Sequence, residues 1–502
     1  MSLPSWLDPL YDGEQMRAID AWAIERQGVP SLDLMERAGE GLAALAGELA
    51  PSGRVVIVAG KGNNAGDGFV AARLLRAQGR EVEVLLAGQA SSLSGDAASN
   101  LERLSESPGR PLADGISADA VLVIDAVLGT GASGAPRGEA LAAIEAIRSA
   151  DAPVLAVDVP SGVDASSGEV AGPAVQAVAT ATFHAAKLGL WIEPGRSLAG
   201  EVHVVDIGMP AGAPVEPGAG LLGDRVLELI PRRGANSTKF SSGRVLVAGG
   251  SRGLTGAPSL AALAAARAGA GYVTVCVPES LSAIFESRLL EAMTIALSDE
   301  DGSHSPAGVA ALAEAADAHG GALALGPGLG RSDAAFAFAH AAIAAIELPV
   351  VLDADGLNAF AGSLEQLRGK RLVLTPHAGE LGRLLEIDAA RISAARLSSA
   401  RAAAERSGAV VVLKGDDTIV AAPGGPVAVS RGASPALATA GTGDVLSGIL
   451  AAMLAKGLEP FEAACAAVRV HALAGIRAGA ARGVDSVIAS DVIEELGAVL
   501  AP

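Results

Sequence analysis

The sequence predicts an α/β protein of two domains, each built on a mainly parallel sheet, from three observations. Short β-branched runs alternate with helical patterns in both halves of the chain, as they do in repeated βα units. Residues 208–220, GMPAGAPVEPGAG, hold Gly, Pro and Ala with almost no charge and mark the boundary between the halves. The chain has 502 residues, 50% of them hydrophobic, and is too long for a single core.

In the first half, apolar residues between positions 14 and 49 recur at helical spacing and predict two amphipathic helices, separated at residues 28–31. Five strand-like runs follow, with helical patterns at 68–79 and 139–150 between them. The runs are RVVIVAG (54–60), EVEVLLAG (81–88), AVLVIDAVLG (120–129), PVLAVDVPSG (153–162) and EVHVVDIG (201–208).

The second half repeats this alternation, so we expect domains at residues 1–215 and 216–502. Helices are expected from Pro258 to Ala268, from Asp444 onward, and from Pro460 to about Ala481. The strand-like runs are RVLVAGGS (244–251), YVTVCVP (272–278), GALALGPGLG (321–330), LPVVLDADG (348–356), RLVLTPHAGE (371–380) and AVVVLKGDDT (409–418).

Composition narrows the class of protein. The net charge of −19 repels the phosphate backbone of nucleic acids, which are therefore excluded as partners. Cys276 and Cys465 lie in apolar runs, as is typical of a reducing compartment. The first residues lack a secretory signal and the later apolar runs are interrupted by polar residues, so we expect a cytoplasmic protein with no membrane segment.

The loop after the first strand of the first half is rich in Gly. Gly60, Gly62 and Ala65 satisfy the G-x-G-x-x-A pattern, but the acid that binds ribose in dinucleotide folds is missing from the end of the next strand. A phosphate loop and a tight turn therefore both remain open. A turn alone rarely needs two adjacent amides together with a carboxylate, as this loop has in Asn63, Asn64 and Asp67.

Two further strands of this half end in acids, Asp125 and Asp158, and Ser161 follows the second of them. Because the carboxyl ends of parallel strands meet at one crevice, these side chains and Asn64 are expected to converge there. Alternatively, each side chain only caps a turn or a helix. Amide, carboxylate and hydroxyl oxygens would suit a hard cation rather than zinc.

In the second half, KGDDT supplies Lys414, Gly415 and Thr418, which could hold a phosphate tail or form a hairpin turn with a solvated lysine. The motif AGTGDVL favours the first interpretation, because the N–H groups around Gly441 and Gly443 lead into a helix. Asp444 would then take a proton from a hydroxyl that attacks phosphorus. Its alternative role is that of an N-cap.

Two other motifs of this half lie at strand ends. His377 and Glu380 are three residues apart, but the chain has only seven His and none is spaced to complete a zinc site. His377 would either contact a substrate or donate a hydrogen bond at the strand end. The loop LGPGLGR, residues 325–331, lets the backbone approach a ligand closely.

Taken together, these motifs resemble the bifunctional NAD(P)H-hydrate repair enzymes over nearly the whole chain. NNAGDG, DAVLGTG and DVPSG are similar to their epimerase domain, and VAGGSRGLTGAPSLAALAAARAGAGYVTV, GPGLG, TPHAGE, KGDDT and ATAGTGDVLSGI to their ADP-dependent dehydratase domain. The resemblance implies a Rossmann-like three-layer sandwich followed by a ribokinase-like domain. It also implies epimerisation of the R and S hydrates of NADH and NADPH (NADHX and NADPHX), and dehydration of the S hydrate with conversion of ADP to AMP and phosphate.

The resemblance also assigns residues. It implies K⁺ in the first domain, Mg²⁺ with ADP in the second, a homo-oligomer, and catalytic roles for Asp125 and Asp444. The K⁺ ligands would be Asn64, Asp125 and Ser161. Substrate would contact Asn63, Asn64, Ala65, Gly66, Asp67, Gly129, Thr130, Gly131, Ala132, Ser133, Gly134, Ala135 and Asp158, and in the second domain Ala257, Gly328, His377 and Asp444. Nucleotide would contact Lys414, Gly415, Asp416, Asp417, Thr418 and Gly443.

Two alternatives and one departure accompany this resemblance. The second half could instead be a vitamin-pathway or sugar kinase, and the first half a nucleotide-binding module without catalysis. Relatives carry a His-Lys pair before the first strand of the second domain, where this chain has Thr238 and Lys239. We therefore assign no role to that segment.

Overall fold

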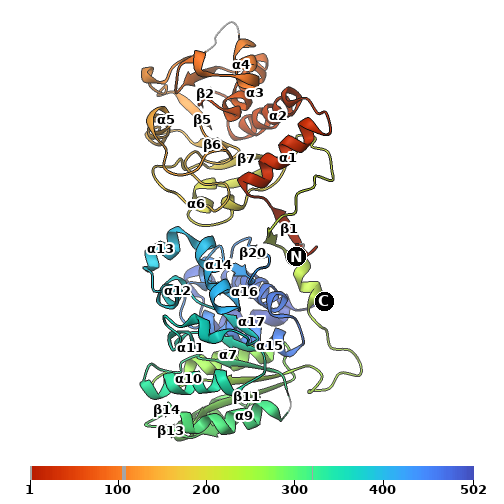
Figure 1. Ribbon diagram of the computed structural model, residues 1–502, viewed down its shortest axis with the longest axis vertical. Helices are drawn as coiled ribbons and strands as arrows, with labels where there is room; N and C mark the ends of the chain where they lie inside the picture. Colours follow the sequence, from red (N-terminus) through yellow and green to blue (C-terminus); the bar gives the residue numbers. More distant parts are fainter. Residues whose placement is uncertain (1–2, 105–108, 319, 502) are drawn as a thin grey trace. The chain divides into compact units, whose positions relative to one another are not determined.

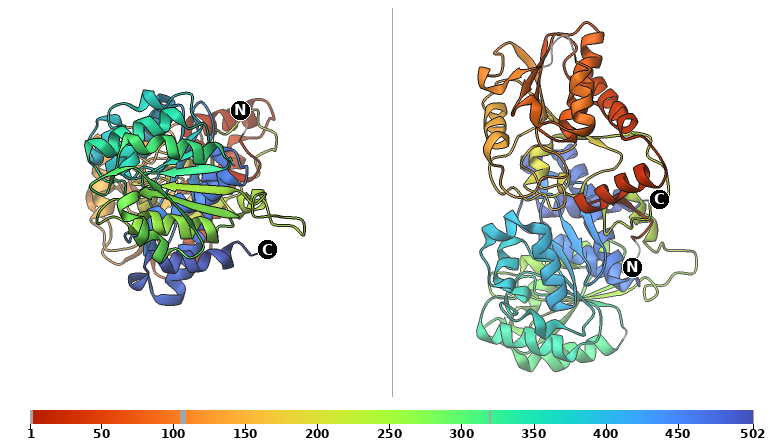
Figure 2. Two further views of the ribbon diagram at one scale, coloured as in Figure 1. Left: turned by 90° about the horizontal axis from the view of Figure 1, so that it is seen from below. Right: turned by 45° about the horizontal axis from the view of Figure 1, so that its top comes forward.

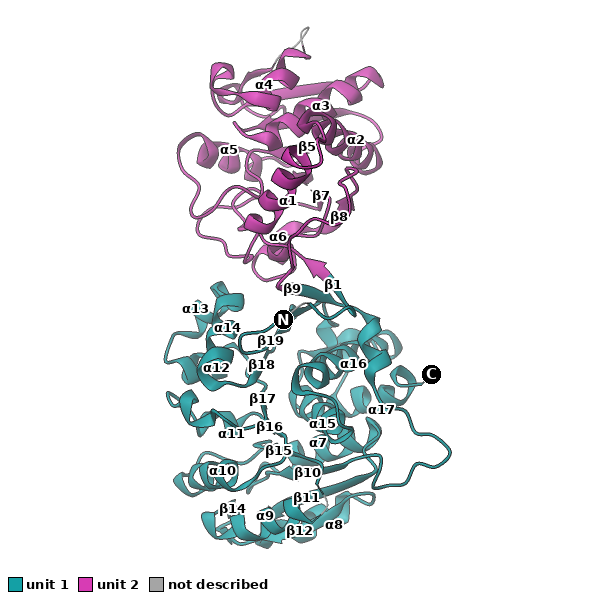
Figure 3. Ribbon diagram, turned by 45° about the vertical axis from the view of Figure 1, so that its right-hand side comes forward, with its two compact units in different colours: residues 1, 3–8, 220–502 teal, residues 2, 9–219 magenta. Residues whose placement is uncertain are grey.

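The computed structural model describes residues 3–104, 109–318 and 320–501. The chain divides into two compact units (Figure 3): residues 9–219 form the N-terminal unit, and residues 220–501 together with 3–8 form the C-terminal unit. Within the described ranges, no helix combines the length and apolar character needed to span a bilayer.

The N-terminal unit contains a seven-stranded parallel sheet in the order β4-β3-β2-β5-β6-β7-β8. Its strands are β2 (Arg54–Ala59), β3 (Val82–Leu86), β4 (Arg110–Pro111), β5 (Ala120–Ala126), β6 (Val154–Val157), β7 (Ala179–Phe183) and β8 (Glu201–Val205). The chain runs outward from β2 to β4 and then returns to β5 on the other side of β2. The carboxyl ends of β2 and β5 therefore flank the switch point where open α/β sheets bind ligands.

Helices cover both faces of this sheet, which confirms the predicted three layers (Figure 1). On one face, Leu42 and Phe69 pack against a core that includes Ile57, and on the other face Ile144 packs against Val56. The helices are α1 (Gly13–Glu25), α2 (Ser31–Leu49), α3 (Asn63–Ala77), α4 (Gly95–Glu102), α5 (Gly138–Arg148) and α6 (Gly195–Ala199).

The C-terminal unit is built on an eleven-stranded sheet in the order β1-β9-β20-β19-β18-β17-β16-β15-β10-β11-β12. Its strands from β10 to β18 are parallel, and β18, β19 and β20 are antiparallel. The strands are β1 (Leu7–Leu10), β9 (Ala219–Leu222), β10 (Arg244–Ala248), β11 (Tyr272–Pro278), β12 (Met293–Leu297), β15 (Ala322–Leu325), β16 (Val350–Leu352), β17 (Leu372–Leu374), β18 (Val410–Leu413), β19 (Ile419–Ala421) and β20 (Val427–Ser430). A separate hairpin joins β13 (Asp299–Glu300) to β14 (Ser303–His304).

Two helical layers enclose this sheet as well. Figure 3 shows α10, α11, α12 and α14 on one side of the strands and α7, α15, α16 and α17 on the other. In the left view of Figure 2, the green strands run between these layers. The helices are α7 (Gly256–Arg267), α8 (Ser282–Arg288), α9 (Val309–Asp317), α10 (Asp333–Ala345), α11 (Asp355–Asn358), α12 (Ala378–Leu385), α13 (Ala389–Ala394), α14 (Arg396–Ser407), α15 (Thr442–Ala455), α16 (Pro460–Arg482) and α17 (Ala489–Val499).

The fold class predicted from the sequence is confirmed, with small shifts at helix ends. The helix expected from Pro258 begins two residues earlier, as α7, and the helix expected from Asp444 begins at Thr442, as α15. Thr238 and Lys239 precede β10 and so lie at the amino end of the strand, opposite to its ligand-binding end.

Candidate active sites

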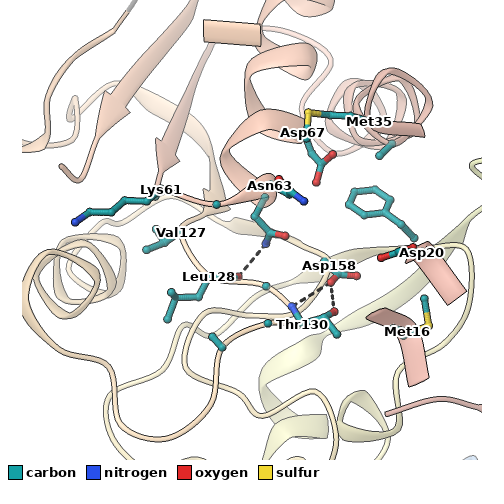
Figure 4. Close-up of a pocket in the computed structure, with 18 of the residues that line it drawn as sticks. Met16, Asp20, Met35, Lys61, Asn63, Asp67, Val127, Leu128, Thr130 and Asp158 are labelled. Carbon is teal, nitrogen blue, oxygen red and sulfur yellow. Dashed lines mark hydrogen bonds between the residues drawn. The ribbon is translucent and has the colours of Figure 1, made fainter. Parts of the chain in front are cut away.

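The N-terminal unit holds a cavity of about 950 Å³ at the switch point of its sheet (Figure 4). The loops after β2 and β5 line it with residues 60–64 and 127–132, and Asp158 lines it after β6. Helix α1 adds Met16 and Asp20, which lie one helical turn apart on the same face. The cavity therefore lies where the topology of a parallel sheet predicts a ligand site.

The substrate residues predicted for this unit divide into two groups. Those that line the cavity are Asn63, Asn64, Asp67, Gly129, Thr130, Gly131, Ala132 and Asp158. Ala65 is instead buried in the core, and a Cβ on Gly66 would lie 2.4 Å from the Met35 sulfur, so these two positions serve helix packing. Ser133, Gly134 and Ala135 lie between Ala132 and Arg137, which both line the cavity, but do not line it themselves.

Asn64, Asp125 and Ser161 converge around the backbone of Leu128. The Ser161 hydroxyl donates to Asp125 Oδ1 over 2.6 Å and accepts from the Leu128 N–H over 2.9 Å. The Asn64 amide donates to the carbonyl oxygens of Leu128 (2.9 Å) and Val157 (2.7 Å). Burial raises the pKa of Asp125 to about 6, against hydrogen bonds from Ser161 and Val127 that lower it. The site thus gathers amide, carboxylate, hydroxyl and carbonyl oxygens, the donor set that suits a hard cation.

Asp158 is held by four hydrogen-bond donors at the floor of the cavity. Lys187 Nζ lies 2.7 Å from its Oδ1, and the Thr182 hydroxyl is 3.3 Å from the same oxygen. The backbone N–H of Thr130 donates to Oδ2 over 3.2 Å, and the Thr130 hydroxyl donates to it as well (Figure 4). Burial alone would raise the pKa of Asp158, but the Lys187 ammonium and these hydrogen bonds outweigh it and lower the pKa.

In the C-terminal unit, four ionisable side chains meet at the carboxyl ends of β16, β17 and β18. Lys414 Nζ lies 3.0 Å from Asp353 Oδ1 and 3.7 Å from Glu380 Oε2, and the Ser447 hydroxyl donates to Asp353 Oδ2 over 2.6 Å. The fourth ionisable side chain, Asp444, lies near Asp353, Lys414 and Glu380. Partial burial and the charge of Asp353 raise the pKa of Asp444 to about 7. A carboxylate with this pKa is suited to accept a proton near neutral pH.

The structure rejects the alternative role of Asp444 as an N-cap. Gly441 is the N-cap of α15, with φ of 92° in the left-handed region that favours glycine, and Asp444 lies in the first helical turn. Among the described residues, none donates a hydrogen bond to the Asp444 carboxylate. A Cβ on Gly443 would lie 3.5 Å from Lys414 Nζ, so this glycine and the lysine are neighbours, as a shared phosphate site requires.

KGDDT is a hairpin turn between antiparallel β18 and β19, but its lysine is ion-paired rather than solvated. Thr418 closes the turn, since its hydroxyl donates to the Gly415 carbonyl over 2.6 Å. Asp416 accepts from the Ala433 N–H over 3.3 Å. Asp417 is buried, and Arg396 holds it through two contacts of 2.8 Å. Asp417 therefore anchors the turn.

We expect Arg396→Met to destabilise the C-terminal unit by about 3 to 5 kcal/mol, because it removes the guanidinium from a buried carboxylate. The free energy of unfolding in urea measures the effect. Arg401→Met, an exposed change on the same helix, is the matched control. Equal stability of the two variants would contradict this role for Arg396.

His377 follows β17, Gly328 follows β15, and Ala257 lies in the first turn of α7, which follows β10. The Nδ1 atom of His377 accepts from the Gly379 N–H over 3.0 Å and caps α12, which leaves Nε2 as the protonated nitrogen. Burial lowers the pKa of His377, which keeps its ring neutral. A Cβ on Gly328 would lie 2.5 Å from the Leu254 carbonyl oxygen and 3.3 Å from the Ala257 side chain. The GPGLG and LTGAP loops therefore touch at Gly328.

Sequence reasoning missed several charged residues of both sites. Asp353 ends a strand, and the argument applied to Asp125 and Asp158 could have found it. Lys187 and Arg396 give no comparable signal, because each is a lone basic residue whose partner comes from another element. Asp20 gives no signal either, because a charged residue on the polar face of an amphipathic helix is ordinary.

Two family models match the chain. Residues 31–189 match the model described as YjeF-related protein N-terminus, and residues 245–497 match the model described as NAD(P)H-hydrate dehydratase. Two curated proteins named bifunctional NAD(P)H-hydrate repair enzyme Nnr, from Moorella thermoacetica and Salinibacter ruber, are each 40% identical to this chain. Each alignment covers 98% of this chain and 96% of the relative.

Solved structures match the C-terminal part of the chain. An ADP/ATP-dependent NAD(P)H-hydrate dehydratase from Bacillus subtilis, co-crystallised with ATP/Mg²⁺, is 29% identical with a TM-score of 0.47, and the match covers 55% of this chain and 95% of that one. A ribokinase-like superfamily protein from Enterococcus faecalis is 25% identical with a TM-score of 0.49, over 56% of this chain and 95% of that one.

Proposed function

The chain belongs to the family of bifunctional NAD(P)H-hydrate repair enzymes, and we propose how its two units divide the work. The N-terminal unit, expected from the sequence as residues 1–215, interconverts the R and S hydrates of NADH and NADPH. The C-terminal unit, expected as residues 216–502, dehydrates the S hydrate and converts ADP to AMP and phosphate. The observation that carries the second assignment is the placement of Asp444 beside Lys414 at the start of α15.

The dehydration follows from the chemistry of a poor leaving group. Asp444 takes the proton of the hydrate hydroxyl, whose oxygen attacks the terminal phosphorus of ADP, and AMP leaves with the electrons of the broken P–O bond. The resulting phosphate ester then loses phosphate and a proton, which restores the ring double bond. Lys414 and the N–H groups near Gly443 face the charge that develops on phosphorus.

We also propose which groups hold the K⁺ and Mg²⁺ ions. K⁺ would be held by the oxygens of Asn64, Asp125 and Ser161 in the N-terminal unit, where it would fix the loop after β5. Mg²⁺ would be bound chiefly by the nucleotide phosphates, because residues 3–104, 109–318 and 320–501 contain no cluster of three His, Cys, Asp or Glu suited to a metal. A homo-oligomeric state and a cytoplasmic location stay predictions from the sequence.

The K⁺ site is tested by epimer exchange without ADP. We expect exchange to be lost when K⁺ is replaced by Li⁺, and Asp125→Ala to be inactive in either salt, because the smaller ion cannot span the oxygens that Asp125 helps to arrange. Dehydration of pure S hydrate in the same salts is the control. Full exchange by Asp125→Ala would remove this residue from the mechanism.

The pH dependence of dehydration tests the role of Asp444. The base must be deprotonated, so kcat/KM is expected to fall tenfold per pH unit below about pH 7. The charge of Glu380 raises the pKa of Asp444, so Glu380→Gln should move this acidic limb to lower pH. Glu386→Gln, at the other end of α12, should leave it in place. An acidic limb unaffected by Glu380→Gln would contradict the assignment.

A further inference from the structure

The cavity of the N-terminal unit contains more ionisable groups than substrate binding requires. Asp20, Asp67, Asp158 and Lys187 all line it, and they come from α1, α3, the end of β6 and the segment after β7. The epimerase reaction proposed above moves a hydroxyl from one face of a ring to the other. The inference that follows rests on that proposed function and concerns which of these groups move the protons.

Asp158 is not available for proton transfer. A carboxylate accepts about four hydrogen bonds, and Asp158 already accepts from Lys187, Thr182 and twice from Thr130. Lys187 is only 2% exposed and also donates to the Phe183 carbonyl oxygen over 2.6 Å. This ion pair is therefore a fixed part of the cavity wall.

Asp67, unlike Asp158, is available for proton transfer. Its side chain is only 7% exposed, and its carboxyl group points into the cavity (Figure 4). The described residues offer this carboxyl group no hydrogen bond, although a buried carboxylate would need several. Burial and the nearby charge of Asp158 raise its pKa well above the ordinary value, which favours the protonated form that a general acid needs.

Asp20 faces the same cavity from helix α1. It shares one face of the helix with Met16 and Ile24, which also line the cavity, and its side chain still reaches solvent. Partial burial and the charge of Asp158 raise its pKa to about 6, while Lys187 opposes the rise. Asp20 is therefore mostly ionised at neutral pH and can exchange protons with water.

Inversion of the hydrated ring carbon requires one proton donor and one proton acceptor. Hydration of an enamine places the hydroxyl on the carbon next to the ring nitrogen, so the hydrate is a carbinolamine. Its carbon inverts when the C–O bond breaks to leave a planar iminium ion and water returns on the other face. One group must give a proton to the departing oxygen, and another must take one from the arriving water.

We propose that Asp67 and Asp20 are the acid–base pair that moves the hydroxyl between the two faces of the hydrated ring. The Asp67 carboxyl protonates the hydroxyl, the C–O electron pair leaves with water, and the nitrogen lone pair forms the C=N bond. A water molecule then adds its electron pair to carbon from the other face, the C=N pair returns to nitrogen, and Asp20 takes the proton released. In the reverse direction the two residues exchange roles, and solvent restores their protons.

The pH dependence of this pair reflects every charged group around it. Asp20 faces the charges of Asp158 and Lys187, and Asp67 faces those of Asp158, Lys187 and Asp20. The other ionisable side chains that line the cavity are Arg17 on α1, Lys61 after β2, Asp96 on α4, Arg137 and Glu139 at α5, and His184 after β7.

The experiment follows exchange between separated R and S hydrates with the full chain, K⁺ and no nucleotide, after subtraction of the uncatalysed rate. Asp20→Asn and Asp67→Asn are each expected to slow exchange by about 10²- to 10⁴-fold. ADP-dependent dehydration of pure S hydrate by the same preparations should be unchanged, which reports that the C-terminal unit is intact. Glu25→Gln, an exposed carboxylate on α1 outside the cavity, should exchange at the wild-type rate.

Two further measurements distinguish a catalytic role of Asp20 and Asp67 from a structural one. The acidic limb near pH 6 in the kcat/KM profile of the wild type should disappear in Asp20→Asn, and each inversion in H₂¹⁸O should bring one labelled oxygen into the product. Exchange by either Asn variant near the wild-type rate, or retention of the original oxygen, would overturn the inference. A wild-type protein that exchanges no epimers would instead overturn the proposed function.

Discussion

Replacing Asp444 with Asn is expected to slow ADP-dependent dehydration of the S hydrate by about 10²- to 10⁴-fold without weakening ADP binding. Asn keeps the size of the side chain but cannot take the hydroxyl proton. The N-cap of α15 is Gly441, so the substitution removes no cap and should leave the helix intact. The effect should therefore appear in kcat rather than in stability.

Single-turnover kinetics and calorimetric titration with ADP measure the two quantities separately. Asp333→Asn is the matched control, since Asp333 is an exposed acid in the first turn of another helix of the same unit. If ADP affinity collapsed with the rate, Asp444 would bind the nucleotide or its metal rather than act as the base.

Replacing Lys187 with Met is expected to destabilise the N-terminal unit by about 3 to 5 kcal/mol. The substitution leaves the buried Asp158 carboxylate without the ammonium group 2.7 Å away, and the loss of that charge raises the pKa of Asp158. Met retains most of the apolar packing of the lysine chain, so the effect reports the charge rather than a cavity.

Hydrogen exchange of the amides in β6 and β7 locates this effect within the N-terminal unit, with β16 and β17 of the C-terminal unit as an internal reference. Lys61→Met is the matched control, because Lys61 lines the same cavity but is largely exposed and pairs with Glu139 at the surface. If the amides of β6 and β7 were equally protected from exchange in Lys187→Met and Lys61→Met, the buried ion pair would not contribute to the stability of the unit.

Much of the fold could be predicted because the central strands of both sheets are continuous β-branched runs. Runs such as RVVIVAG and AVVVLKG carry this signal in their own residues. Sequence reasoning missed the short strands at the ends of the sheets, β4, β1, β9, β12, β19 and β20, as well as the β13–β14 hairpin and β7, which lies inside its sheet between β6 and β8. Pairing of such short strands depends on tertiary structure, which local patterns do not contain.

The sites could be predicted where a residue ends a strand. Asp125 lies near the carboxyl end of β5, and Asp158 and Ser161 follow the neighbouring β6, so parallel topology alone brings them to one edge. Lys187 and Arg396 could not be found in this way, because their role depends on a buried partner from a different element. For Asp444, the sequence favoured a base and kept a cap as the alternative, and the position of Gly441 excludes the cap.

The repair of purified S hydrate tests the central claim most directly. The full chain is mixed with the hydrate and Mg²⁺, with ADP, with ATP or without nucleotide, and the characteristic near-ultraviolet absorbance of NADH is followed over time. The proposed function predicts that this absorbance returns with ADP, that AMP and phosphate form in equal amounts, and that nothing happens without a nucleotide. No return of absorbance with either nucleotide, or transfer of phosphate to a stable alcohol instead, would contradict it.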